Sequence, residues 1–182
     1  MSILLGKSTT AEETVKLLNV ISTSAIGRDY ILSKENIIES LCLLMKSQES
    51  DNPVRLNCLG ILQKLTLRSS VHNKLFKNNL IEWCLNILYN EQATLSEYTV
   101  EYCLALLMNL SLTDKGRDQC INSLNLFIKV VLNYLQSDNI QVRTCINGTL
   151  YSLFKNKTVR EDADIQGVKK ALEESILIDS TN

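Results

Sequence analysis

Three segments of this chain align with one another without gaps, at residues 54–66, 99–111 and 142–154. Each has a small residue at its seventh position, Gly60, Ala105 and Gly148, at intervals of 45 and then 43 residues. Leucines recur two and five positions later, at Leu62, Leu65, Leu107, Leu110, Leu150 and Leu153. A period in the low forties, with segments of helical character, is typical of repeat proteins in which each unit packs on its neighbours.

A second set of aligned segments precedes the first set, at residues 38–45, 81–88 and 128–135. The apolar residues Ile81, Cys84, Leu85 and Leu88 follow the i, i+3, i+4, i+7 spacing of one helix face. Shorter amphipathic stretches come before these segments, at residues 25–34, 70–78 and 115–122. Each unit is therefore expected to contain a short, a medium and a long helix, which is the plan of an armadillo repeat.

We predict an all-α fold, a right-handed α-solenoid of about three full three-helix armadillo repeats with a partial repeat at each end. The predicted domain spans residues 8–177, with flexible ends at 1–7 and 178–182. Its full repeats are placed at 24–68, 69–113 and 114–156, and its partial repeats at 8–23 and 157–177. The fragmentary first repeat indicates a chain that belongs to a longer protein. The recurrent leucines are expected to form the core, because single helices of this length are marginal in water.

Composition narrows the classes of function. The net charge is −1, whereas nucleic-acid-binding proteins usually carry a clear basic excess, and no apolar run is long enough to cross a bilayer. The six cysteines are scattered at helical core positions, which favours reduced, buried thiols over disulfides or zinc. His72 is the single histidine, and we expect it to be exposed or to cap a helix. We therefore predict no enzyme, cofactor, metal, small-molecule ligand, nucleic acid or membrane, and a cytoplasmic protein.

The long helices are the candidate binding surface, because in a solenoid of this kind they line the concave face. Residues spaced by three or four positions share one stripe of a helix. We predict that the partner-binding stripe consists of Tyr98, Glu101, Tyr102, Ala105, Asn109, Arg55, Lys64, Arg143 and Ser152. Two explanations of the small residues at its centre stay open, close packing between adjacent long helices and a shallow floor for a peptide.

Residues 105–111 resemble the long-helix signature of armadillo proteins, with Asn109 at the place of the asparagine that binds an extended peptide in importins and catenins. The equivalent residues are Lys64 and Ser152, so there is no ladder of asparagines. A more specific resemblance is to the armadillo region of the LisH-domain-containing armadillo proteins of cilia and basal bodies. It rests on residues 57–68, 79–83, 95–112, 147–152 and 159–163.

That resemblance implies a non-enzymatic scaffold of the basal body or centriole, the cytoskeleton and the ciliary tip, in a family implicated in ciliogenesis and Joubert syndrome. It also implies a protein partner, a ciliary microtubule-associated protein with a TOG array. Two alternatives stay open: a generic armadillo adaptor that binds extended peptides in transport or adhesion, and direct binding of tubulin or microtubules.

Overall fold

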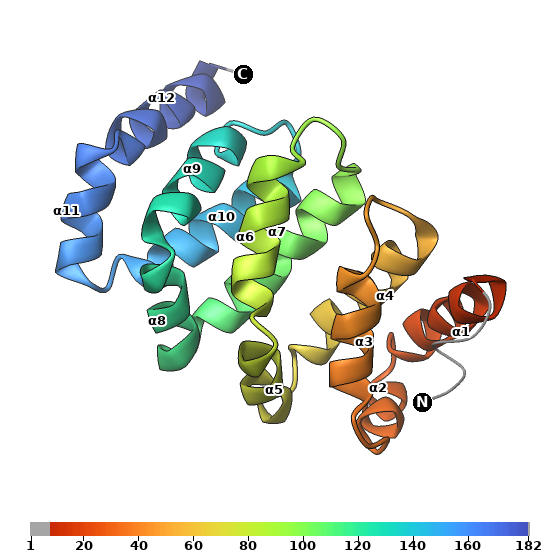
Figure 1. Ribbon diagram of the computed structural model, residues 1–182. Helices are drawn as coiled ribbons and strands as arrows, with labels where there is room; N and C mark the ends of the chain where they lie inside the picture. The colour runs from red at the N-terminus through yellow and green to blue at the C-terminus, as the bar shows by residue number, and fades with distance from the viewer. Residues whose placement is uncertain (1–7, 182) are drawn as a thin grey trace. The chain divides into compact units, whose positions relative to one another are not determined.

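The computed structural model describes residues 8–181 and contains twelve α-helices, with no strand in that part of the chain (Figure 1). Residues 1–7, predicted to be a flexible end, lie outside the described residues. At the other end, the backbone of α12 (Val168–Thr181) reaches into the predicted flexible end at 178–182, and Asn182 lies outside.

The helices follow the predicted order of short, medium and long. The first repeat contains α2 (Ala25–Leu32), α3 (Ile37–Lys46) and α4 (Pro53–Leu65). The second contains a 3-10 turn (Ser69–Val71), α5 (His72–Lys77), α6 (Leu80–Asn90) and α7 (Glu97–Ser111). The third contains α8 (Asp114–Asn122), α9 (Leu124–Tyr134) and α10 (Ile140–Leu153). A single helix, α1 (Ser8–Ile21), precedes them, and α11 (Lys157–Ile165) and α12 follow. The all-α class, with three three-helix repeats and partial repeats at both ends, is confirmed.

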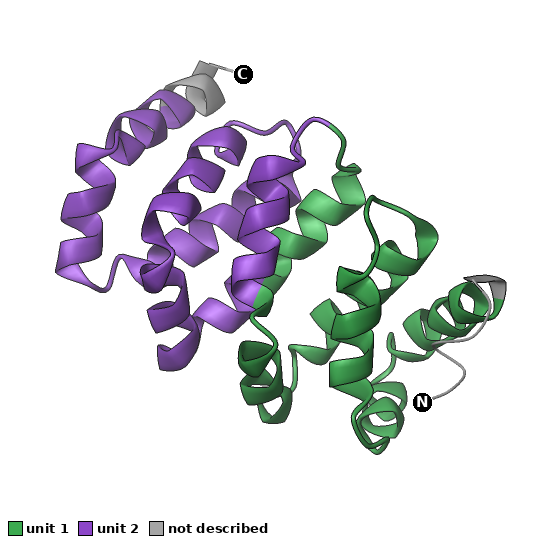
Figure 2. Ribbon diagram, in the orientation of Figure 1, with its two compact units in different colours: residues 1–80, 94–106 green, residues 81–93, 107–182 purple. Residues whose placement is uncertain are grey.

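The chain forms two compact units, shown in green and purple in Figure 2. Unit 1 comprises residues up to Leu80 together with Thr94–Leu106, and unit 2 comprises Ile81–Ala93 together with the residues from Leu107 onward. In unit 1, α4 packs against α1 and α3; in unit 2, α10 packs against α8 and α9. The recurrent leucines are buried within these two cores, each exposing 4% or less of its surface. All six cysteines are free and buried beside them.

The short helices begin with the same local structure in both units. In unit 1 the Ser24 side chain accepts a hydrogen bond from the Gly27 backbone N–H, which caps α2. In unit 2 the Thr113 side chain does the same for the Gly116 N–H and α8. A Cβ atom on Gly27 would lie 1.8 Å from the carbonyl oxygen of Ile21, and one on Gly116 would lie 1.9 Å from that of Leu110. Glycine is therefore required in α2 and α8, at the two places where the short helix meets the last turn of the preceding long helix this closely.

A cationic or imidazole side chain then caps the last turn of that long helix. Arg28 donates to the carbonyl oxygens of Ser22 and Thr23 at 3.0 Å each, and Arg117 donates to that of Leu112 at 3.0 Å. His72 occupies the equivalent place in the second repeat, with Nε2 2.7 Å from the carbonyl oxygen of Thr66. Such groups satisfy carbonyls that have no partner within the helix. The capping role expected for His72 is confirmed.

Candidate interaction surface

Three long helices of unit 1, α1, α4 and α7, meet in a cluster of polar side chains. The Asn19 amide on α1 donates to Asn57 Oδ1 on α4 over 2.9 Å. Lys64 Nζ, two turns further along α4, donates to Asn19 Oδ1 over 2.6 Å and to the Asn19 carbonyl over 3.2 Å. Burial, together with the charge of Arg28, lowers the pKa of Lys64 below its ordinary value. The predicted site residue Lys64 is thus held by a neighbouring helix.

Gly60 lies at the centre of this cluster and is buried. A Cβ atom there would lie 2.3 Å from the hydroxyl oxygen of Tyr98 on α7 and 3.0 Å from Asn19 Oδ1. The missing side chain therefore leaves room for the Asn19 and Tyr98 side chains, which reach over Gly60 from α1 and α7. In unit 2, Gly148 of α10 faces Met108 of α7, whose sulfur would lie 2.7 Å from an added Cβ. Of the two explanations left open by the sequence, close packing between long helices is the one that holds at both glycines.

A stacked pair of tyrosines borders the cluster on α7. The rings of Tyr98 and Tyr102 lie 4.0 Å apart between centroids and 14° from parallel. Burial raises the pKa of Tyr98 to about 12, helped by the charge of Tyr102, while a hydrogen bond with Asn19 acts in the opposite direction. Glu101 and Ala105 follow on the same helix, and both are half-buried. Four of the predicted stripe residues thus lie together, with one carboxylate beside two aromatic rings.

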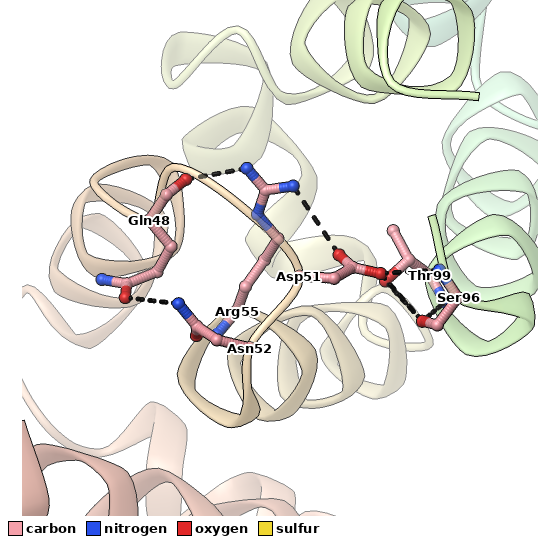
Figure 3. A network of polar contacts seen from close by, with 6 residues as sticks. All are labelled: Gln48, Asp51, Asn52, Arg55, Ser96 and Thr99. Atoms are coloured by element: carbon pink, nitrogen blue, oxygen red, sulfur yellow. Dashed lines mark hydrogen bonds and ion pairs between the residues drawn. The ribbon is translucent and has the colours of Figure 1, made fainter. Parts of the chain in front are cut away.

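Arg55 lies elsewhere, in the first turn of α4, where it joins a polar network with the loop before that helix (Figure 3). Its side chain is 3% exposed, donates to the Gln48 carbonyl over 2.7 Å and lies 3.6 Å from Asp51 Oδ1. The other oxygen of Asp51 accepts from the Ser96 backbone N–H over 2.9 Å and from its hydroxyl over 2.8 Å, just before α7 begins. Asp51 thereby ties the loop ahead of α4 to the start of α7. Arg55 stabilises this junction and has almost no surface left for a partner.

The remaining predicted residues belong to unit 2. Ser152 is 2% exposed, and its hydroxyl donates to the Ser111 carbonyl over 2.5 Å. Arg143 is half-buried and donates to the Ser137 carbonyl over 2.6 Å. Asn109 is half-buried on α7. Ser152 therefore joins α10 to the end of α7, whereas Arg143 and Asn109 keep part of their surface exposed.

Sequence reasoning missed Asn19 and Asn57, although the repeat alignment contained the signal. Residues 15–22 align with 104–111, which makes Asn19 the equivalent of Met108, and each of these two residues faces the glycine of the next long helix. In the same register Asn57 is equivalent to Tyr102. Reading the alignment across neighbouring repeats would have placed Asn19 against Gly60.

No group of three or more histidine, cysteine, aspartate or glutamate side chains is arranged to hold a metal ion within the part of the chain that the structure describes. No helix among residues 8–181 has the length and apolar character needed to span a membrane.

Comparison with known proteins gives a consistent family. Residues 75–182 match the family model described as the ARM repeats of LisH domain-containing protein ARMC9. The chain belongs to the ARMC9 family. Curated relatives named LisH domain-containing protein ARMC9 are 36% identical to it in Xenopus tropicalis, 35% in Bos taurus and 33% in Homo sapiens. These alignments cover 87%, 87% and 86% of this chain and 20%, 24% and 19% of the relatives.

The chain therefore spans about a fifth of the length of the ARMC9 relatives it matches. The family model begins within α5 and covers the rest of the second repeat, the third repeat and the two helices that follow. The resemblance to LisH-domain-containing armadillo proteins, noted from the sequence, is confirmed. Armadillo repeats in this family indicate a scaffold for protein–protein interaction.

Proposed function

We propose that these repeats form a non-enzymatic scaffold that binds a protein partner through the long-helix surface of unit 1. Membership of the ARMC9 family and the armadillo architecture support a scaffold. The stacked pair Tyr98–Tyr102 beside Glu101 is the observation that carries the choice of surface. Aromatic rings supply large contact area at interfaces, and a half-buried carboxylate adds a charge that a basic partner side chain can pair with.

The proposed contact residues are those of the predicted stripe that keep accessible surface. In unit 1 these are Tyr98, Glu101, Tyr102 and Ala105, with Lys64 at the side. Asn109 and Arg143 are the candidate contact residues of unit 2, taken by itself. Arg55 and Ser152 are excluded because their side chains are buried in bonds to their own chain.

The proposed setting is the basal body, the centriole and the ciliary tip, where the scaffold would take part in cilium assembly and stability. The proposed partner is a ciliary microtubule-associated protein with a TOG array. Support for this setting comes from the ARMC9 family resemblance.

The experiment that tests the surface is a binding titration of the 182-residue chain against a purified ciliary TOG array. Glu101→Arg and Tyr102→Ala should each weaken binding at least tenfold while the thermal melt stays close to that of the wild type. Tyr102→Phe keeps the stacked ring and should bind nearly as well as the wild type. Glu35→Arg, the same charge reversal at an exposed residue between α2 and α3, should leave binding unchanged.

Two further probes separate the alternatives. An extended basic peptide that binds tightly, and loses affinity in Glu101→Arg, would favour a generic adaptor. Purified tubulin that binds and is released by added salt would favour direct microtubule contact, since screening weakens charge attraction between surfaces. If the TOG array binds wild type, Glu101→Arg and Tyr102→Ala equally, the stripe on α7 is not the contact surface.

A further inference from the structure

Unit 2 carries a groove at the turn between α8 and α9, lined also by residues of α6 and α11. The volume of this α8–α9 groove is about 480 Å³, within the range of about 300–1,000 Å³ that is usual for binding pockets. Three of its lining residues are apolar. The other six are polar: Glu82, Asn86, Asn122, Ser123, Asn125 and Asp162. A mostly polar lining of this kind suits a charged group better than an apolar small molecule.

Hydrogen bonds within unit 2 hold the walls of the α8–α9 groove in place. The Gln166 side chain, at the end of α11, donates to Asn125 Oδ1 on α9 over 3.2 Å, and Asp162 lies one turn before Gln166. On α6 the Asn86 amide donates to the Glu82 backbone carbonyl over 2.9 Å. The groove is therefore formed in advance, while the side chains of Glu82 and Asp162 stay exposed.

These two carboxylates have no cation beside them. Neither Glu82 nor Asp162 forms an ion pair with any of residues 8–181. Lys129, the one cationic residue of α9, lies with Nζ 5.2 Å from the centroid of the Tyr89 ring and does not line the groove. The lining thus combines two negative charges with neutral polar groups and contains no positive charge.

The preceding repeat shows how a glutamate at this position is paired. Glu82 on α6 aligns with Glu39 on α3. The Glu39 carboxylate lies 3.9 Å from Lys74 Nζ on α5, which is the short helix of the following repeat. Within unit 1, the chain itself therefore supplies a lysine to the medium-helix glutamate.

The third repeat lacks that lysine. Leu75 on α5 and Cys120 on α8 are equivalent residues, and both are fully buried. In that register Lys74 corresponds to Gln119, and Lys77 corresponds to Asn122, which lines the groove. Both basic residues are thus replaced by neutral ones, and Glu82 loses the cation that Glu39 keeps.

We propose that the α8–α9 groove binds an arginine or lysine side chain from an extended basic segment of a partner protein. The cationic head would pair with Glu82, as Lys74 pairs with Glu39, and with Asp162. The amide oxygens of the lining asparagines can accept its remaining N–H donors, and the apolar residues can contact its methylene stem. This contact lies on unit 2 and does not depend on the surface proposed for α7.

Fluorescence anisotropy tests the proposal with the 182-residue chain and a labelled peptide of alternating glycine and arginine. A twin peptide with glutamine in place of each arginine should not bind. Glu82→Gln and Asp162→Asn should each weaken binding about two- to fivefold, as expected for a partly exposed ion pair, and together about tenfold. Both residues are exposed, so the thermal melts should not change. As the matched control, Asp138→Asn, at an exposed residue beyond the far end of α9, should bind like the wild type.

The decisive variant is Gln119→Lys, which gives α8 the lysine that α5 already has. Its ammonium group should pair with Glu82 and weaken peptide binding as much as Glu82→Gln does. Gln136→Lys adds the same charge at an exposed residue after α9 and should leave binding unchanged. These titrations are made at physiological salt, where charges more than about 8 Å apart are largely screened.

Three results would overturn the proposal. The first is a wild-type chain that does not bind the arginine peptide, and the second is equal binding by Glu82→Gln, Asp162→Asn and Asp138→Asn. The third is a loss of binding in Glu101→Arg but not in Glu82→Gln, which would place the peptide on α7. The TOG-array titration uses a different ligand and different variants, so either proposal can fail without the other.

Discussion

The contact between Gly116 and the end of α7 offers a sharp test of how the repeats are joined. Both partners belong to unit 2, where a Cβ atom on Gly116 would lie 1.9 Å from the Leu110 carbonyl oxygen. That oxygen also accepts hydrogen bonds from the Thr113 backbone N–H over 3.2 Å and from the Thr113 hydroxyl over 2.9 Å. In Gly116→Ala, α8 must therefore move away from a backbone group that cannot rotate aside.

The expected loss of stability follows from three effects. Overpacking costs about 1–3 kcal/mol. Displacing the Thr113 cap from the Gly116 N–H, now 3.2 Å away, costs about 1 kcal/mol. Alanine has a higher helix propensity than glycine, which stabilises the variant by at most about 1 kcal/mol, and by less in the first turn of a helix. The net destabilisation should be about 1–4 kcal/mol, which lowers the melting temperature by about 2–16 °C for a chain of this size.

The matched control is Gly148→Ala on α10, also in unit 2. Its new Cβ would meet only the sulfur and Cγ of Met108, at 2.7 and 3.1 Å, and that flexible side chain can turn away. The change in unfolding free energy should therefore stay within about 1 kcal/mol of the wild type, because the gain in helix propensity offsets the crowding. Urea and thermal unfolding followed by circular dichroism measure both variants. Equal stability of Gly116→Ala and Gly148→Ala would refute the close approach of Gly116 to the Leu110 carbonyl oxygen.

Three further predictions concern buried polar groups and thiols. Asp51→Ala leaves the buried Arg55 without its carboxylate and should destabilise the chain by about 3–5 kcal/mol in urea unfolding; a loss below about 1 kcal/mol would make that pair unimportant. Burial raises the pKa of Tyr98 to about 12, so the stability that this residue contributes is complete below pH ~10 and falls as the pH rises through about 12. The difference in 295 nm absorbance between wild type and Tyr98→Phe should accordingly titrate near pH 12, and a midpoint near 10 would contradict the burial. All six cysteines are buried, so Ellman's reagent should label none of them in the folded chain and all six after denaturation; at Cys58 and Cys120 burial also raises the thiol pKa to about 12.

The helical plan could be predicted from the sequence because periodicity reports burial directly. Leu62, Leu107 and Leu150 recur since each long helix buries the same face, and that pattern survives changes at the surface. The positive φ angles of Asn36, Asn79 and Gly167, directly before α3, α6 and α12, carry a weaker signal. Asparagine and glycine tolerate that conformation, yet they also occur in many other turns, so sequence alone could not place these junctions.

Helical periodicity predicted the candidate surface less well than it predicted the fold. A helical stripe shows which residues of one helix share a face, but it does not show what the neighbouring helix contributes. Arg55 was placed on the stripe by spacing, whereas the loop ahead of α4 folds Asp51 and Gln48 against it and buries it. Ser152 was likewise placed on the surface, whereas its hydroxyl donates a hydrogen bond to the Ser111 carbonyl and is buried. Contacts with residues outside the helix that carries the side chain decided both cases.

These contacts bear on how the surface would recognise a partner. An asparagine at each groove position can hold the main chain of any extended peptide, which favours broad recognition. Of the three residues aligned with that asparagine, Lys64, Asn109 and Ser152, two are already used in packing. Lys64 donates a hydrogen bond to Asn19, and Ser152 donates one to the Ser111 carbonyl. The groups of unit 1 that remain accessible for the proposed contact are the stacked tyrosines and Glu101, which offer aromatic surface and one negative charge. Selection of a particular folded partner therefore fits this surface better than general binding of extended peptides, because main-chain contacts would have to replace bonds that hold α1 to α4.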